Sequence, residues 1–333
     1  MMPPDSTRMK ITSRRKDDET GEHSQFMADA LAGLTSAPKR LRPKYFYDRI
    51  GSRLFDDICD LPEYYITRAE LSIVEAHAKD MVGGWGKAVR LVEPGAGSGT
   101  KTRLLLRALG VDRTREYVPV DIARDHLADS AARLAHDLPW LSISPLCADF
   151  DQEFHLGPST AERTVVYFPG STIGNFDPPD AARLLARFRR IAGPSGAILL
   201  GVDLKKDPRT LHAAYNDRDG VTAAFNKNLL VRMNRELGAT FDVDAFTHYA
   251  FYEPMRGRIE MHLISSRKQR VLIGDVMVSF EEGESVRTEC SYKYAPLQIA
   301  RLAHDAGLSL VNGWFDAGRR FAVVELRPAA HPS

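Results

Sequence analysis

The chain has 333 residues, of which 44% are hydrophobic and 27% charged, which excludes a wholly disordered or collagen-like protein. Its net charge is only +1, and no run approaches the roughly 18 apolar residues of a membrane span, so we expect neither nucleic acid nor a membrane as partner. Three cysteines (Cys59, Cys147, Cys290) and ten histidines show no metal-ligand spacing, so we expect free thiols, no metal and a cytoplasmic location.

The N-terminal part begins with a polar segment. Residues 1–24 cannot bury enough apolar surface to offset the entropy of ordering, so we expect a disordered tail. A helical pattern starts at Phe26, and an aromatic stretch over 45–55 must pack on another element. A further helix is predicted at about 68–80.

The middle of the chain alternates short apolar runs with longer helical patterns. Strands are expected at 88–92, 117–120, 143–147, 164–168 and 197–204, and helices at 101–109, 125–138 and 179–192. Strands separated by helices of roughly ten to fifteen residues indicate an α/β fold with a parallel sheet covered on both faces.

The pattern changes after residue 207. Two helical stretches, at about 208–216 and 219–236, precede runs that look like consecutive strands. These runs lie at 247–252, 258–264 and 270–278, and short turns between them suggest an antiparallel meander. A helix at 297–306 and strands at 308–311 and 321–326 close the chain.

This alternation divides the chain into two units. We expect an α/β domain from residues 66–206 and 293–333. A second, smaller α+β domain would combine the N-terminal segment 25–65 with an internal insertion, 207–292.

A glycine-rich turn, Gly95 to Gly99, follows the first strand of the core. Residues without side chains let the backbone approach a ligand, and the helix that follows offers free N–H groups. Asp121, at the end of the next strand, can accept both hydroxyls of a ribose. The third strand ends near Asp149 and Phe150, where an acid and a ring can bind an adenine amine and cover its ring.

The glycine-rich turn differs from the dinucleotide-binding pattern, and the difference indicates which ligand it binds. A dinucleotide fold requires GxGxxG, but Thr100 stands where the last glycine should be. Glu93, two residues before the first glycine, suits a ligand with an amino group. S-adenosylmethionine (SAM) has such a group and is favoured, and the alternatives are a nicotinamide dinucleotide or a tight turn without a ligand.

Four further positions carry groups that suit a substrate. Tyr64 lies just before the core and either lines a pocket or fills a domain seam. Asn175 follows the fourth strand, where open α/β sheets bind ligands, or belongs to a capped turn. Tyr215 ends a helical stretch and could be an ordinary helix tyrosine. Glu289 and Ser291 share one face of a strand, which either binds the two nitrogens of an imidazole or faces solvent.

Together these segments resemble the ergothioneine-pathway histidine Nα-methyltransferases from about Leu34 to Leu326. The matching motifs are Pro43–Asp48, Leu61–Tyr65, Gly170–Asn175, Gly220–Asn226 and Arg258–Met261. The resemblance implies a Rossmann-type class I methyltransferase fold with a second domain. It also implies transfer of three methyl groups from SAM to the α-amino nitrogen of L-histidine, which gives hercynine.

The resemblance also implies roles for single residues. Tyr64, Asn175 and Tyr215 would bind the carboxylate and amine of histidine, with Tyr64 also taking part in catalysis. Glu289 and Ser291 would contact the imidazole. The 66–206 and 293–333 domain would bind SAM and the other domain histidine. The cofactor contacts would be Gly95, Lys101, Asp121, Asp149 and Phe150, with Lys101 meeting the methionine carboxylate.

Two other functions stay open. The acceptor could be another amino acid or an indole amine, as in fungal relatives that methylate a tryptophan derivative, although Glu289 and Ser291 favour histidine. The protein could also sense its ligands without turnover, against which Asp149, Asn175 and Tyr215 argue. In every case the expected partner is a small molecule, and we expect a monomer.

Overall fold

The computed structural model describes residues 16–97 and 99–329. Residues 1–15 of the expected tail lie outside this range. The first helix, α1 (Lys16–Leu34), begins ten residues before Phe26, so residues 16–24 are helical rather than part of a tail. The apolar pattern starts later because Phe26 is buried in the core, whereas His23, Ser24 and Gln25 are exposed. No helix in the described ranges is long and apolar enough to cross a membrane.

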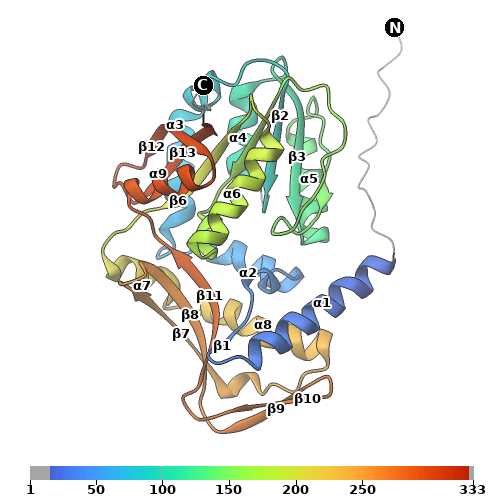
Figure 1. Ribbon diagram of the computed structural model, residues 1–333, viewed down its shortest axis with the longest axis vertical. Coiled ribbons are helices and arrows are strands. Elements are labelled where there is room, and N and C mark those ends of the chain that lie inside the picture. Colours follow the sequence, from blue (N-terminus) through green and yellow to red (C-terminus); the bar gives the residue numbers. More distant parts are fainter. Residues whose placement is uncertain (1–15, 98, 330–333) are drawn as a thin grey trace.

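A seven-stranded sheet forms the upper part of the protein in Figure 1, in the strand order β12-β13-β6-β5-β2-β3-β4. Pairing from β4 to β6 is parallel, and β13 and β12 are added by antiparallel pairing. The strands are β2 (Val89–Pro94), β3 (Thr114–Asp121), β4 (Leu146–Cys147), β5 (Arg163–Phe168), β6 (Ala197–Asp203), β12 (Leu308–Phe315) and β13 (Phe321–Pro328). The predicted Rossmann-type α/β fold is therefore confirmed.

Helices cover this sheet on both faces. Alternate residues of β5 belong to two separate hydrophobic layers, Val165 and Tyr167 to one and Val166 and Phe168 to the other. Burial on both faces explains why β6 is an apolar run from Ala197 to Val202 without polar alternation. The covering helices are α3 (Tyr65–Gly83), α4 (Thr100–Leu109), α5 (Arg124–Asp137), α6 (Pro178–Ala192) and α9 (Pro296–Asp305).

A second sheet lies below the first in Figure 1, in the order β1-β11-β8-β7. Its short strand β1 comes from the N-terminal segment and pairs with β11 in parallel, whereas β11, β8 and β7 pair antiparallel. Helix α8 packs against β7 and β8. The bounds are β1 (Lys39–Arg40), β7 (Phe246–Glu253), β8 (Arg258–Ser265), β11 (Ser285–Tyr292), α7 (Pro208–Tyr215) and α8 (Val221–Leu237).

One helix was missed by the sequence pattern. The second helix, α2 (Arg49–Asp60), lies between the two sheets and carries part of the aromatic stretch (Figure 1). Asp48 caps its start by accepting a hydrogen bond from the Gly51 backbone at 2.6 Å. Gly51 lowers the helical signal, yet a Cβ there would lie 1.7 Å from the Phe46 carbonyl oxygen, so close packing requires the glycine.

The expected meander is interrupted. The single strand predicted at 270–278 is a hairpin of β9 (Gln269–Ile273) and β10 (Val276–Phe280). The chain reverses at Gly274, whose φ of 55° is in the left-handed region that favours glycine. This hairpin forms its own two-stranded sheet, and β11 then returns to pair with β8.

The strand order places two loops at one crevice. The chain passes from β2 to β3 and β4 on one side of the sheet, then resumes on the other side of β2 with β5 and β6. The carboxyl ends of β2 and β5 therefore flank the point where the winding reverses, which is where open α/β sheets bind ligands. The glycine turn follows β2, and the loop with Asn175 follows β5.

Candidate functional site

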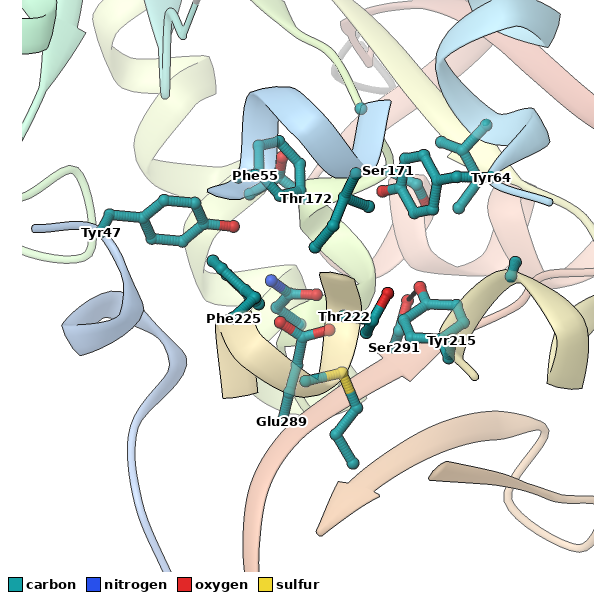
Figure 2. A pocket seen from close by; sticks show the side chains of 16 residues that line it. Tyr47, Phe55, Tyr64, Ser171, Thr172, Tyr215, Thr222, Phe225, Glu289 and Ser291 are labelled. Carbon is teal, nitrogen blue, oxygen red and sulfur yellow. Dashed lines mark hydrogen bonds between the residues drawn. The ribbon is translucent and has the colours of Figure 1, made fainter. Parts of the chain in front are cut away.

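A pocket lies between the loop after β5 and the second sheet (Figure 2). The lining combines polar groups with aromatic rings from both parts of the chain. It includes all five residues expected to bind substrate, which are Tyr64, Asn175, Tyr215, Glu289 and Ser291.

The loop after β5 forms one wall of this pocket. Gly170 and Ser171 both have left-handed backbone angles, with φ of 73° and 58°. Such a conformation is strained for serine, and it is maintained because the buried Ser171 hydroxyl accepts a hydrogen bond from the Asp203 backbone at 2.9 Å. At Gly174 a Cβ would lie 2.7 Å from the Tyr292 carbonyl oxygen. The loop is thus fixed between β6 and β11, and Asn175 lies at its end.

Tyrosine rings line the side of the pocket next to α3 and α7. Tyr64 immediately precedes α3, and its ring meets that of Tyr215 edge-on at 6.4 Å. Both side chains are buried, and burial raises the pKa of Tyr64 well above 10. In the described residues the Tyr64 hydroxyl has no hydrogen-bond partner. It therefore stays protonated and is available to a ligand.

Strand β11 supplies the opposite wall, with Glu289 and Ser291 side by side as the period-2 argument predicted (Figure 2). The pairing of β11 with β8 shifts register between Arg287 and Glu289, and such a bulge re-aims the residues that follow. Only 9% of Glu289 is exposed, and burial raises its pKa to about 7. Its carboxylate has no hydrogen-bond partner among the residues described.

Directly behind Ser291 lies a lysine that sequence reasoning did not identify. Lys293 is 1% exposed, and its ammonium donates hydrogen bonds to Ser291 Oγ at 2.7 Å and Tyr215 Oη at 3.1 Å. Its third contact is with Asp203 Oδ2 at 3.0 Å. Although burial alone would favour the neutral amine, Tyr215 and Asp203 raise the pKa of Lys293 above its usual value. The only signal for Lys293 in the sequence was its spacing of two residues from Ser291, which continues the strand face of Glu289 and Ser291.

Other residues that line the pocket come from the matching motifs or, in the case of Phe55, from the aromatic stretch over 45–55. Tyr47 and Phe55 meet edge-on at 5.6 Å, and both rings approach Phe225 of α8. Met261 contributes from β8 and Thr222 from α8. An aromatic residue in a polar context was the available signal for Tyr47, but it fits a core residue equally well.

The residues expected to bind the cofactor form a separate group beside the pocket. Asp121 Oδ1 accepts a hydrogen bond from the Ala123 backbone at 2.9 Å, and its other oxygen accepts from Gly97 at 3.5 Å. Gly95 and Gly97 have φ of 69° and 49°, which only glycine adopts without strain. Burial raises the pKa of Asp121. The end of β3 and the glycine turn are therefore held together.

The other end of this group is formed by Asp149 and Phe150. A Cβ on Gly95 would lie 3.5 Å from the Phe150 ring, which in turn meets Phe168 at 5.5 Å. Asp149 forms an ion pair at 3.0 Å with Lys44, a residue of the N-terminal segment. An acid and a ring thus flank the glycine turn, as the sequence suggested.

Lys101 connects the residues expected to bind the cofactor with those that line the pocket. Its ammonium pairs with Glu70, whose carboxylate is fully buried and also accepts a hydrogen bond from the Gly170 backbone at 2.8 Å. Gly170 lines the pocket, so the helix after the glycine turn reaches the pocket wall. Glu70 was missed because an acid within a helix is usually solvated. Glu93 is also buried, accepts a hydrogen bond from Tyr117, and has its pKa raised by burial to about 7.

Comparisons with known proteins agree over most of the chain. A family model described as "Histidine-specific methyltransferase, SAM-dependent" matches residues 26–328. A histidine N-alpha-methyltransferase from Mycolicibacterium smegmatis is 41% identical over 300 residues, covering 89% of this chain and 92% of that protein. One from Mycobacterium tuberculosis is 39% identical over 318 residues, covering 95% and 98%. Ergothioneine biosynthesis protein 1 from Neurospora crassa is 29% identical over 295 residues, covering 83% of this chain and 32% of that longer protein.

Proposed function

Because the chain belongs to the SAM-dependent, histidine-specific methyltransferase family, we propose that it methylates the α-amino nitrogen of L-histidine. Three transfers from SAM would yield hercynine, and this trimethylation would be the first step of ergothioneine biosynthesis. The observation that carries this proposal is the convergence of Tyr64, Asn175, Tyr215, Glu289 and Ser291 on one pocket. That pocket adjoins the glycine turn through Lys101 and Gly170.

The pocket offers groups for each end of a histidine molecule. Asn175 has both donor and acceptor atoms, so with the hydroxyls of Tyr64 and Tyr215 it suits the carboxylate and amine. Glu289 and Ser291 offer an acceptor and a hydroxyl to the two ring nitrogens. A buried site built to hydrogen-bond a ring rejects side chains that leave its polar groups unpaired.

The cofactor would bind along the glycine turn. The open backbone at Gly95 and Gly97 leaves room for a ligand, Asp121 suits the ribose hydroxyls, and Asp149 with Phe150 suits the adenine. Lys101 would direct its ammonium to the methionine carboxylate, and Glu70 keeps that ammonium at the pocket wall. SAM supplies an electrophilic methyl group on a sulfonium, so the protein's task is alignment, which can contribute roughly 7–11 kcal/mol.

We assign the two parts of the chain accordingly. Residues 66–206 and 293–333 would bind SAM, and residues 25–65 and 207–292 would bind histidine. Pairing of β1 with β11 supports this division, because it joins the N-terminal segment to the insertion.

Tyr64 would act on the amine as a neutral hydroxyl. The α-ammonium must lose a proton before it can attack, but burial raises the pKa of Tyr64 so far that a phenolate is disfavoured. Its hydroxyl can orient the amine directly or through a water, and the free amine is taken from solution. If Tyr64→Phe leaves the rate of the first methylation unchanged at every pH, the tyrosine has no such role.

Aromatic rings around the amine would stabilise the product. The rings of Tyr64 and Tyr215 meet at 6.4 Å, and a growing alkylammonium against the face of either ring would gain roughly 0.5–2 kcal/mol by cation–π attraction. A crystal structure with hercynine tests this directly. A quaternary nitrogen remote from both rings would exclude the interaction.

The function itself is tested by incubating the full chain with SAM and L-histidine and analysing the products by mass spectrometry. We expect mono-, di- and trimethylated histidine in succession. A competition assay across the twenty amino acids should show that histidine alone is methylated efficiently. Binding of both ligands without product would identify a sensor, and preferred methylation of another amine would identify a different acceptor.

A further inference from the structure

The buried ammonium of Lys293 has no donor left for a ligand. It carries three N–H groups, and the structure gives it three acceptors: Ser291 Oγ, Tyr215 Oη and Asp203 Oδ2. With 1% exposure, it cannot exchange these partners for water. Lys293 therefore acts on the pocket only through the two hydroxyls that it holds.

Those two hydroxyls have a fixed hydrogen-bonding capacity. The Tyr215 hydroxyl donates to Ser291 Oγ at 2.8 Å, so Ser291 Oγ accepts from both Tyr215 and Lys293. A serine hydroxyl has two lone pairs, and both are now used, which leaves only its own O–H for a ligand. In this arrangement Ser291 presents one hydrogen and no lone pair to the pocket, whereas Tyr215 Oη, which accepts only from Lys293, keeps one lone pair.

Glu289, the other residue expected to contact the ring, offers hydrogen-bond acceptors instead of a donor. Glu289 offers carboxylate oxygens and lies on the same strand face as Ser291. A ring that satisfies both must donate one N–H to Glu289 and accept one O–H with a bare nitrogen. Neutral imidazole has this pair of groups, whereas imidazolium has two donors and would set one of them against the hydroxyl hydrogen.

The charges around the cluster favour the same form. Lys293 and Lys206 are balanced by Asp203 and Glu289, and Lys206 also donates to the neighbouring Tyr65 at 2.6 Å. Tyr47, Tyr64, Tyr65 and Tyr215 remain protonated because burial raises the pKa of each. Arg320, above the Tyr65 ring, is balanced by its ion pair with Asp316. With Glu289 ionised, the surroundings of the ring carry no net charge, so a protonated ring would add an uncompensated one.

We propose that Lys293 is a positioning residue that makes the pocket bind the neutral imidazole ring, by fixing the Ser291 hydroxyl as a hydrogen-bond donor. The proposal rests on the proposed function, since it takes histidine as the ligand. It assigns Lys293 to the specificity of the site, although the lysine is shielded from the pocket by the two hydroxyls. If the positive charge of Lys293 were removed, the carboxylate of Glu289 would favour binding of the protonated imidazole ring.

The first test uses the unaltered chain. L-histidine labelled with ¹⁵N in the ring is bound together with S-adenosylhomocysteine, and the ring signals are recorded near neutral pH. We expect one pyrrole-type and one pyridine-type nitrogen. Two pyrrole-type signals would show bound imidazolium and would overturn the proposal.

The second test compares L-histidine with 2-fluoro-L-histidine, whose ring stays neutral throughout the pH range used. Both ligands face the same Glu289, so the ratio of their dissociation constants isolates protonation of the ring. Between pH 7.5 and pH 5.5 this ratio should rise about tenfold in the unaltered protein, because an ordinary imidazole with a pKa near 6.5 becomes protonated. In Lys293→Met it should change less than about threefold, since the protonated ring is then accepted.

Lys205→Met, at the exposed lysine near the same strand end, is the matched control and should keep the tenfold change. An equal pH response in Lys293→Met and the unaltered chain would mean that Lys293 is only structural. Lys293→Gln gives a second neutral replacement, with binding of S-adenosylhomocysteine as the check on folding. Absence of any histidine binding by the unaltered chain would instead contradict the proposed function, so the two failures are distinguishable.

Discussion

The glycine turn and the pocket differ in how their polar groups are satisfied. At the turn, Asp121 is bonded to the backbone, and Lys101 and Asp149 are ion-paired within the chain. In the pocket, Glu289 and the Tyr64 hydroxyl have no partner among the described residues. Buried polar groups without partners cost free energy, so a pocket that keeps them is suited to a ligand that supplies them. The turn is a preformed scaffold, whereas the pocket is completed by its ligand.

The largest expected effect is on the pocket side. Glu289→Ala should weaken histidine binding about 100-fold, because it removes a charge-assisted hydrogen bond from a buried site. Affinity for S-adenosylhomocysteine should change less than about twofold. Isothermal titration calorimetry of both ligands measures this, with Glu282→Ala, an exposed acid of the same insertion, as control. Equal loss of both affinities would make Glu289 structural and remove the contrast between the two regions.

A second substitution of Glu289 should measure how much its unpaired buried carboxylate lowers the free energy of unfolding. The folded pKa of Glu289, about 7, lies above its ordinary value of 4.5, so its contribution to stability is present below pH 4.5 and is lost as pH rises through 7. Glu289→Gln does not titrate and should be more stable than the unaltered chain at pH 8, by about 2 kcal/mol, but not at pH 4.5. Denaturant unfolding at both pH values gives the difference. A gain of the same size at both would show that the charge is not its source.

A substitution near the glycine turn should weaken binding of the cofactor product and leave histidine binding unchanged. Asp121→Ala should weaken S-adenosylhomocysteine binding about tenfold, since one hydrogen-bonding group of a ligand is typically worth about 1.4 kcal/mol. Histidine affinity at saturating S-adenosylhomocysteine should be unchanged. Asp112→Ala, an exposed acid before the same strand, serves as control for calorimetry. A comparable loss of histidine affinity would show that the two regions are one cooperative site.

The smallest effect is expected at the ion pair between the N-terminal segment and Asp149. Lys44→Met removes the ion pair with Asp149, and partly exposed pairs contribute less than about 1 kcal/mol. S-adenosylhomocysteine affinity should change about twofold and become less dependent on salt between low and moderate ionic strength. A tenfold change would mean that Lys44 contacts the ligand itself.

Local sequence patterns predicted the core well because its strands contain short apolar runs and its helices are periodic. They missed α2, where Gly51 is required for close packing on Phe46 but weakens the helical pattern. They merged β9 and β10 because a single glycine reverses the chain.

The five residues expected to bind substrate were singled out by residue type and by the family resemblance, although only Tyr64 and Asn175 lie in the matching motifs, and the structure places all five in one pocket. Lys293 could not be found in this way. Its partners Asp203 and Tyr215 come from distant parts of the sequence, so its role depends on three-dimensional contacts that no local pattern contains.

The parallel pairing of β1 with β11 has a consequence for synthesis on the ribosome. It joins Lys39 and Arg40 to residues 286–287, so the strand that carries Glu289 can take its place only after most of the chain has been translated. Strands β2 to β6, by contrast, lie within residues 89–203 and can pair much earlier. We therefore expect nascent chains to form the parallel part of the seven-stranded sheet first, and to complete the pocket that Glu289 lines only near the end of translation.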